Sequence, residues 1–163
     1  MRIGIFLLAT LFSVPAGAQS PQLFAAGSTR VNVAAGSGRF DGTNRVIFGA
    51  GLGYYAIDGL ELALEGDVWL GGDVSLARAS PSIRYVLWQL GDVTPYAGAF
   101  YRRWFVGEPF EDLDTIGVRV GAFAGRSGSS YLGLGVAYER QVAPACQSDC
   151  DYVYPELTAA LAF

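Results

Sequence analysis

The chain has 163 residues, of which 52% are hydrophobic and 16% charged, and its formal net charge at neutral pH is −4. A soluble domain carries about 25% charged residues, and nucleic-acid binders need clustered positive charge, so this composition excludes a disordered tail and a nucleic-acid binder. The sequence also contains no histidine, which removes the most frequent general base and metal ligand.

The first predicted element is a secretory signal. Met1 and Arg2 form a short positive start, residues 3–14 form a nearly continuous apolar run, and Ala18 ends a group of small residues. The run is too short to span a bilayer as a helix, and this arrangement is typical of a cleaved signal peptide. We therefore predict a signal peptide over residues 1–18 and an exported domain over residues 19–163.

From residue 29 onward, hydrophobic residues recur at every second position. Leu60, Leu62 and Leu64 share one parity, whereas Glu61 and Glu65 share the other. This is the period of a β-strand with one apolar and one polar face, and glycine-rich or aspartate-rich turn signals separate the segments. We expect eight strands, at residues 27–36, 45–56, 60–70, 74–88, 93–106, 115–125, 130–141 and 152–163.

Each expected strand is long enough to cross a bilayer when it is tilted. One face of the strands is nearly free of charge, whereas the other carries glycine, serine and isolated arginines or glutamates. The narrow interior of an eight-stranded barrel is filled by such side chains, and an uncharged outer face suits lipid. The sequence predicts an all-β, eight-stranded antiparallel up-and-down transmembrane β-barrel. A soluble periplasmic barrel that binds a small ligand is an alternative.

Aromatic residues and connections indicate how this barrel would sit. We expect outer loops at residues 37–44, 107–114 and 142–151 to be long, the connection at residues 71–73 to be short, and both termini to lie in the periplasm. Aromatic residues gather near the strand ends, as in the two girdles at membrane interfaces. The first set is Tyr54, Tyr55, Tyr85, Trp88, Tyr96, Tyr131 and Phe163, and the second is Trp69, Trp104, Phe105, Tyr138, Tyr152 and Tyr154.

Charged residues of the inner parity predict a network of ion pairs, because an unpaired charge in a narrow lumen costs several kcal/mol. The network residues are Arg30, Glu61, Glu65, Asp67, Arg78, Arg84, Arg119, Glu139 and Glu156; Asn32, Arg45 and Arg102 share their parity. The turn after the third strand allows two registers. One pairs Glu65 with Arg78, and the other pairs Asp67 with Arg78 and Glu61 with Arg84. Closure of the barrel is expected to bring Glu156 near Arg30 or Asn32.

The network has two interpretations. In the first, the pairs only fill and neutralise the interior. In the second, exchange of partners gates a narrow ion path, whose conductance falls when Arg78 or Glu65 is replaced. Inner glycines on the second, sixth and seventh strands leave space for Trp69 and the arginines, or else for a small cavity.

Two further groups lie in expected loops. Cys146 and Cys150 form an even pair in the exported part, which predicts one disulfide that pins a loop; a metal site with Asp149 and Asp151 is the alternative. The acidic residues of the third outer loop are either a solvated surface or a site for a divalent cation that bridges to lipopolysaccharide. They are Glu108, Glu111, Asp112 and Asp114.

The last segment, residues 157–163, alternates and ends in phenylalanine. With this segment and its eight alternating strands, the chain resembles over residues 19–163 the small eight-stranded outer-membrane barrels of Gram-negative bacteria, of the outer membrane protein A and X type. The resemblance implies a protein of the outer membrane with a structural or surface-interaction role. It also implies an assembly signal made by Leu157, Leu161 and Phe163.

The partners that the resemblance implies are the export translocon, periplasmic chaperones, the barrel-assembly machinery, and outer-membrane lipid and lipopolysaccharide. We expect a monomer that binds no nucleic acid. Enzymatic barrels of this size rely on an active-site histidine, and this chain has none. We therefore expect no catalytic activity, no metal and no cofactor.

Overall fold

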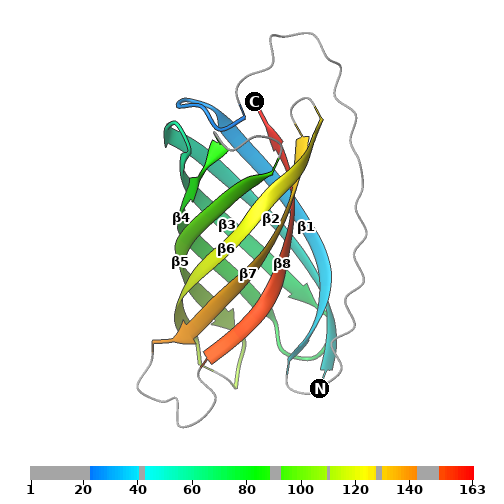
Figure 1. The fold of residues 1–163 in the computed structure, drawn as a ribbon. Coiled ribbons are helices and arrows are strands. Elements are labelled where there is room, and N and C mark those ends of the chain that lie inside the picture. Colours follow the sequence, from blue (N-terminus) through cyan, green and yellow to red (C-terminus); the bar gives the residue numbers. More distant parts are fainter. Residues whose placement is uncertain (1–22, 41–42, 89–92, 110, 128–129, 143–150) are drawn as a thin grey trace.

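Eight strands follow one another along the chain, each hydrogen-bonded to its sequence neighbours, and the last pairs with the first to close a barrel (Figure 1). The computed structural model describes residues 23–40, 43–88, 93–109, 111–127, 130–142 and 151–163. The strands are β1 (Thr29–Phe40), β2 (Thr43–Ile57), β3 (Leu60–Leu70), β4 (Leu76–Val86), β5 (Thr94–Val106), β6 (Leu113–Ser127), β7 (Ser130–Gln141) and β8 (Asp151–Ala162). The predicted all-β, eight-stranded antiparallel barrel is confirmed.

The expected strand bounds agree closely except at the first hairpin. We expected a loop over residues 37–44, but β1 continues to Phe40 and β2 begins at Thr43. Small residues that suggested a turn instead lie in the ladder, where Gly36 pairs with Ile47 and Gly38 with Arg45. The hydrogen bonds of the partner strand hold these weak strand formers in place, so the long first loop was wrong.

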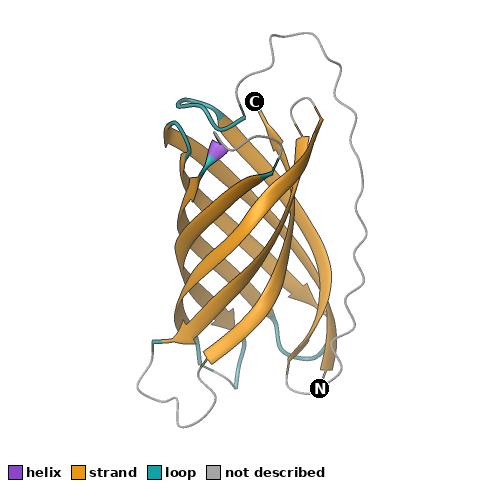
Figure 2. Ribbon diagram, viewed as in Figure 1, coloured by secondary structure: helices purple, strands orange, loops and turns teal. Residues whose placement is uncertain are grey.

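The two faces of the wall differ in the way that the alternation predicts. Leu62, Leu64 and Val136 point outward and are exposed, whereas Arg30 and Glu61 point inward and are fully buried. The polar residues are therefore inside and the apolar residues outside. Figure 2 shows that strands joined by short connections make up almost all of the described chain. None of the described helical segments has the length and apolar character needed to cross a membrane.

The turn between β3 and β4 selects one of the two predicted registers. Asp67 lies opposite Arg78, and Glu61 lies opposite Arg84. Two oppositely charged cross-strand pairs thus face the lumen from one hairpin, and the alternative pairing of Glu65 with Arg78 is wrong.

The seam between β1 and β8 is shorter than the strands that form it. Its register runs from Arg30↔Ala162 to Val33↔Ala159, whereas β1 and β2 pair from Thr29↔Tyr54 to Phe40↔Thr43. The backbones of Thr29 and Phe163 extend the seam by two hydrogen bonds, of 3.1 and 2.9 Å.

Candidate functional site: the barrel lumen

The centre of the lumen holds a layer of arginines and glutamates. Arg30 donates from Nε to Glu61, and both side chains are completely buried. Arg84 approaches the other oxygen of Glu61, with 3.7 Å between Nη1 and Oε2. These pairs arise because β1 and β4 bring their inner arginines to the two sides of the carboxylate on β3.

Glu65 is shared by three arginines. Its oxygens lie 3.4 Å from Arg30 Nη2, 3.6 Å from Arg84 Nη2 and 3.2 Å from Arg119 Nη1. Arg119 also approaches Glu156, at 3.8 Å. The three arginines and three glutamates of this layer balance in charge, which is the condition for burying them.

The position of Glu156 corrects an expectation. We expected it near Arg30 or Asn32, but the closing register places Ala162 opposite Arg30 and Ala160 opposite Asn32. Glu156 therefore lies farther along β8, where Arg119 of β6 reaches it across β7.

A second polar layer lies nearer the end of the barrel opposite the C-terminus (Figure 1). Arg102 donates from Nη1 to Glu139 Oε2 at 2.6 Å and to the hydroxyl of Tyr154 at 2.8 Å. The Tyr154 hydroxyl donates to the same carboxylate at 2.7 Å, and Thr115 donates to its other oxygen. The sequence placed Arg102 in the lumen but did not identify Glu139 as its partner, because this pairing depends on the registers of β5, β6 and β7 together.

Two tryptophans enclose an ion pair in this layer. Arg78 donates from Nε to Asp67 at 2.7 Å, and its guanidinium lies 5.0 Å from the Trp69 ring and 4.7 Å from the Trp104 ring. Trp69 also donates to Asp67 at 2.7 Å. Cation–π contacts of this kind stabilise a partly desolvated arginine. The expected place of Trp69 and Trp104 in an outward girdle was therefore wrong.

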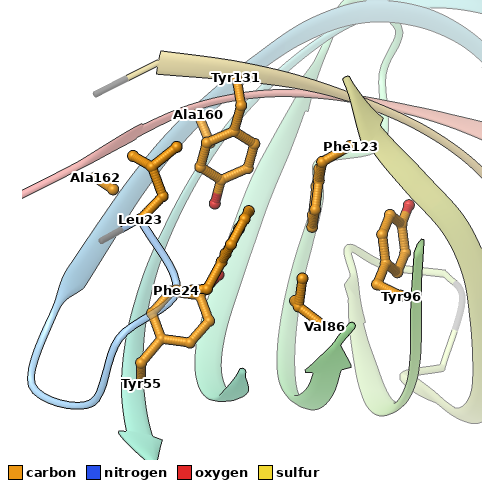
Figure 3. Close-up of a cluster of buried hydrophobic side chains, with 9 residues drawn as sticks. All are labelled: Leu23, Phe24, Tyr55, Val86, Tyr96, Phe123, Tyr131, Ala160 and Ala162. Carbon is orange, nitrogen blue, oxygen red and sulfur yellow. The ribbon is translucent and has the colours of Figure 1, made fainter. Parts of the chain in front are cut away.

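An aromatic cluster fills the lumen at the end of the barrel where the C-terminus lies (Figure 3). The rings of Tyr96 and Phe123 stack with centroids 4.5 Å apart, and Tyr131 meets Phe123 edge-on at 4.7 Å. Tyr55, Tyr96 and Tyr131 were also expected in a girdle, but their parity turns them inward. The cluster comprises Leu23, Phe24, Tyr55, Val86, Tyr96, Phe123, Tyr131, Ala160 and Ala162, with Trp88 packed against it.

The segment before β1 contributes to this cluster. Phe24 contacts the rings of Tyr55, Phe123 and Tyr131 at centroid distances of 5.8, 5.8 and 5.4 Å. Backbone hydrogen bonds fix the segment, from Gly59 N to Phe24 O at 2.7 Å and from Gly27 N to Tyr55 O at 2.8 Å. This segment was not predicted from the sequence, although two adjacent apolar residues shortly before the first strand, Leu23 and Phe24, were a signal for it.

Inner glycines make room for the aromatic rings. A Cβ added at Gly121 would lie 2.6 Å from the ring of Tyr96, and one added at Gly133 would lie 2.6 Å from the ring of Phe123. Gly117 is similarly close to Phe100. The glycines thus leave space for rings from β5 and β6, rather than for Trp69 as we expected.

The structure describes the aspartates of the acidic loop, Asp112 and Asp114, but not the two cysteines. Asp112 and Asp114 lie 3.0 and 3.2 Å from the two terminal nitrogens of Arg103. Within the described ranges, no three histidine, cysteine, aspartate or glutamate side chains come together as metal ligands. Cys146, Cys150 and the predicted signal peptide lie outside the described residues.

Leu157, Leu161 and Phe163 alternate outward on and just after β8. Phe163 is exposed, while its backbone pairs with Thr29.

No protein-family model matches the chain, and no curated protein matches its sequence. Solved structures do match its fold. The N-terminal β-barrel domain of Pseudomonas aeruginosa OprF superposes with a TM-score of 0.63 at 14% identity, covering 85% of this chain and 98% of that one. For Neisserial surface protein A, NspA, the TM-score is 0.54 at 18% identity, with 83% and 94% covered.

The outer membrane protein OprG from Pseudomonas aeruginosa matches with a TM-score of 0.56 at 14% identity, covering 87% of this chain and 98% of that one. These likenesses extend over nearly the whole of the solved chains. The chain therefore has the fold of the small eight-stranded outer-membrane barrels.

Proposed function

We propose that this protein is an integral outer-membrane barrel with a structural or surface-interaction role and no catalytic activity. The observation that carries the proposal is the inverted distribution of polarity. Large apolar side chains such as Leu64, Leu134 and Val153 are exposed on the outer wall, whereas buried charges line the inside. A soluble barrel requires the opposite arrangement, because a wide apolar surface in water promotes association.

The packed lumen supports a structural role over a conducting one. Its charged groups are engaged in ion pairs, and the aromatic cluster draws side chains from six strands and from the segment before β1. An ion path through the lumen would need displacement of Phe24 as well as exchange of the central ion pairs. We therefore favour interior packing as the role of the network residues.

Proposed partners follow from the membrane location. They are outer-membrane lipid and lipopolysaccharide, periplasmic chaperones and the barrel-assembly machinery, and we propose a monomer. The proposed assembly signal is the outward row of Leu157, Leu161 and Phe163. Because the backbone of Phe163 also closes the seam, only a substitution that keeps this backbone isolates the role of its ring.

Cell fractionation and gel migration test the proposal. The chain is expected in the outer-membrane fraction, with migration that changes on heating because a folded barrel resists detergent. Phe163→Ala is expected to reduce the assembled fraction, whereas Phe105→Ala, an equal truncation on the outer wall, leaves it unchanged. A chain recovered in the soluble periplasmic fraction would instead support the small-ligand-binding barrel, and equal assembly of the two variants would refute the terminal signal.

A further inference from the structure

A proline interrupts the hydrogen-bond ladder between β4 and β5. The two strands keep one register along their paired length, but the pairing is interrupted at Ser80 and Pro81. On its other side, Pro81 pairs with Leu64 of β3, so it lies inside the sheet. Proline has no N–H and is rare in a strand that is paired on both sides. The β4–β5 ladder therefore lacks a donor at this position.

The backbone group that loses its partner is the carbonyl oxygen of Tyr101. Leu87 N donates to Pro95 O at 2.8 Å, and hydrogen-bonded pairs recur at every second position of an antiparallel ladder. Counting from Leu87 in steps of two reaches Pro81, which the register places opposite Tyr101. Because Pro81 cannot donate, the Tyr101 carbonyl receives no hydrogen bond from the ladder. The Tyr101 hydroxyl, in contrast, donates to Asp114 at 2.5 Å.

This carbonyl lies in the apolar part of the wall. Tyr101 is near the middle of β5 (Thr94–Val106), and the side chains of Tyr101 and Pro81 are both exposed on the outer face. Hydrocarbon contains no water that could donate to a free backbone oxygen, and leaving such a group unpaired there is costly. In a membrane, a donor group of a lipid-dissolved molecule would satisfy it.

A groove lies beside this carbonyl on the outer wall. It has a volume of about 710 Å³ and extends over β4, β5, β6 and β7, which follow one another around the barrel (Figure 1). Ala99 of β5 lies opposite Ile83 on one side and Val118 on the other. Its small side chain leaves a trough between these two larger residues. The volume is within the range of small-molecule sites, and the trough suits an alkyl chain.

A cation lies at the edge of the same groove. Arg140 lines the groove and is the residue before the last of β7. The register places Tyr101 opposite Ile116 and Ile116 opposite Arg140, so two strand spacings, about 10 Å, separate the backbones of Tyr101 and Arg140. Arg140 pairs with Asp151 at 3.5 Å, and both side chains are exposed. Exposed pairs of this kind are weak, so Arg140 remains able to bind an anion.

We propose that this groove binds a hydroxylated fatty acid from the membrane. The carboxylate pairs with Arg140 at the edge of the groove, as arginine and carboxylate groups commonly do. The alkyl chain lies over Ala99, and a hydroxyl near the middle of the chain, which is a single donor, donates to the carbonyl oxygen of Tyr101. This inference rests on the proposed membrane location, because only an embedded wall meets such a molecule in lipid.

A competition between two fatty acids tests the site. The full-length protein in phospholipid nanodiscs receives equal amounts of ricinoleate and oleate, which differ by one hydroxyl group near the middle of the chain, and native mass spectrometry counts the molecules of each that stay bound. Ricinoleate is expected to bind about three- to tenfold more tightly, the contribution of one hydrogen bond. Methyl ricinoleate, which lacks the charge, is expected to bind more weakly than ricinoleate.

Three variants separate the two anchoring groups. Pro81→Ala supplies the missing N–H, so it is expected to abolish the preference for ricinoleate while oleate still binds. Arg140→Gln is expected to weaken both acids equally and to keep the preference. The control Pro155→Ala, at an exposed proline of β8 outside the groove, leaves both acids unchanged.

Two results would overturn the site. They are equal binding of ricinoleate and oleate to the unaltered chain, and an undiminished preference in Pro81→Ala. Recovery of the chain in the soluble fraction would overturn the membrane location itself, whereas an embedded barrel that binds the two acids equally overturns only the site.

Discussion

At the scale of single residues, we expect the largest losses of stability when one partner of a central ion pair is removed. Arg30 and Glu61 are both completely buried, and removing one partner of a buried pair leaves an uncompensated charge that costs about 3–5 kcal/mol. Arg30→Met is therefore expected to lower the free energy of unfolding by about that amount, measured by urea titration in detergent micelles or lipid vesicles.

Two controls decide whether pairing is the cause. Arg103→Met breaks solvent-exposed pairs and is expected to cost far less, because ion pairs in water contribute little to stability. Joining Arg30→Met with Glu61→Met leaves the layer balanced again, so the double variant is expected to recover part of the loss. If Arg30→Met costs no more than Arg103→Met, or if the double variant is as unstable as the sum of its parts, the ion-pair explanation is wrong.

At the scale of elements, the segment at residues 23–28 connects parts of the wall that are far apart. Phe24 contacts rings on β2, β6 and β7, and its carbonyl accepts from Gly59 in the turn between β2 and β3. These contacts lie on both sides of the short β1–β8 seam. We infer that the segment holds the barrel together where its own ladder is shortest.

Truncation of the Phe24 ring tests this inference. Phe24→Ala is expected to destabilise the barrel by about 3–5 kcal/mol, the range for a buried phenylalanine, because its cavity lies inside the aromatic cluster. Phe105→Ala removes a ring of the same size from the outer wall, where lipid can refill the space, and it is expected to cost clearly less. Equal urea midpoints for the two variants would show that the segment contributes little to stability.

Strand parity and turn chemistry were enough to predict the elements, but not which elements meet across the lumen. Alternation alone placed Glu61, Arg84 and Arg119 inside, because successive side chains of a strand point to opposite faces. The contact of Arg119 with Glu156 depends on the registers of β6, β7 and β8 together. The sequence pattern of one strand does not determine these registers. The parity of Tyr55 and Tyr96 also indicates an inward position. We instead gave weight to their place near the strand ends, and this produced the wrong girdle.

At the scale of the whole molecule, the proposed membrane location makes a prediction that depends on depth. Leu134 lies near the middle of β7 and is 68% exposed on the outer wall, and Val142 lies just beyond the C-terminal end of the same strand. An arginine facing lipid costs about 2–4 kcal/mol at the bilayer midplane and about 0–1 kcal/mol near an interface. Leu134→Arg is therefore expected to destabilise the vesicle-embedded barrel by at least about 2 kcal/mol more than Val142→Arg, measured by urea unfolding. On a barrel surrounded by water, both changes would be surface substitutions within about 0.5 kcal/mol of neutral. Equal and small effects at the two positions would mean that the apolar outer wall does not face lipid, and that the exposed residues of β7 serve another interface.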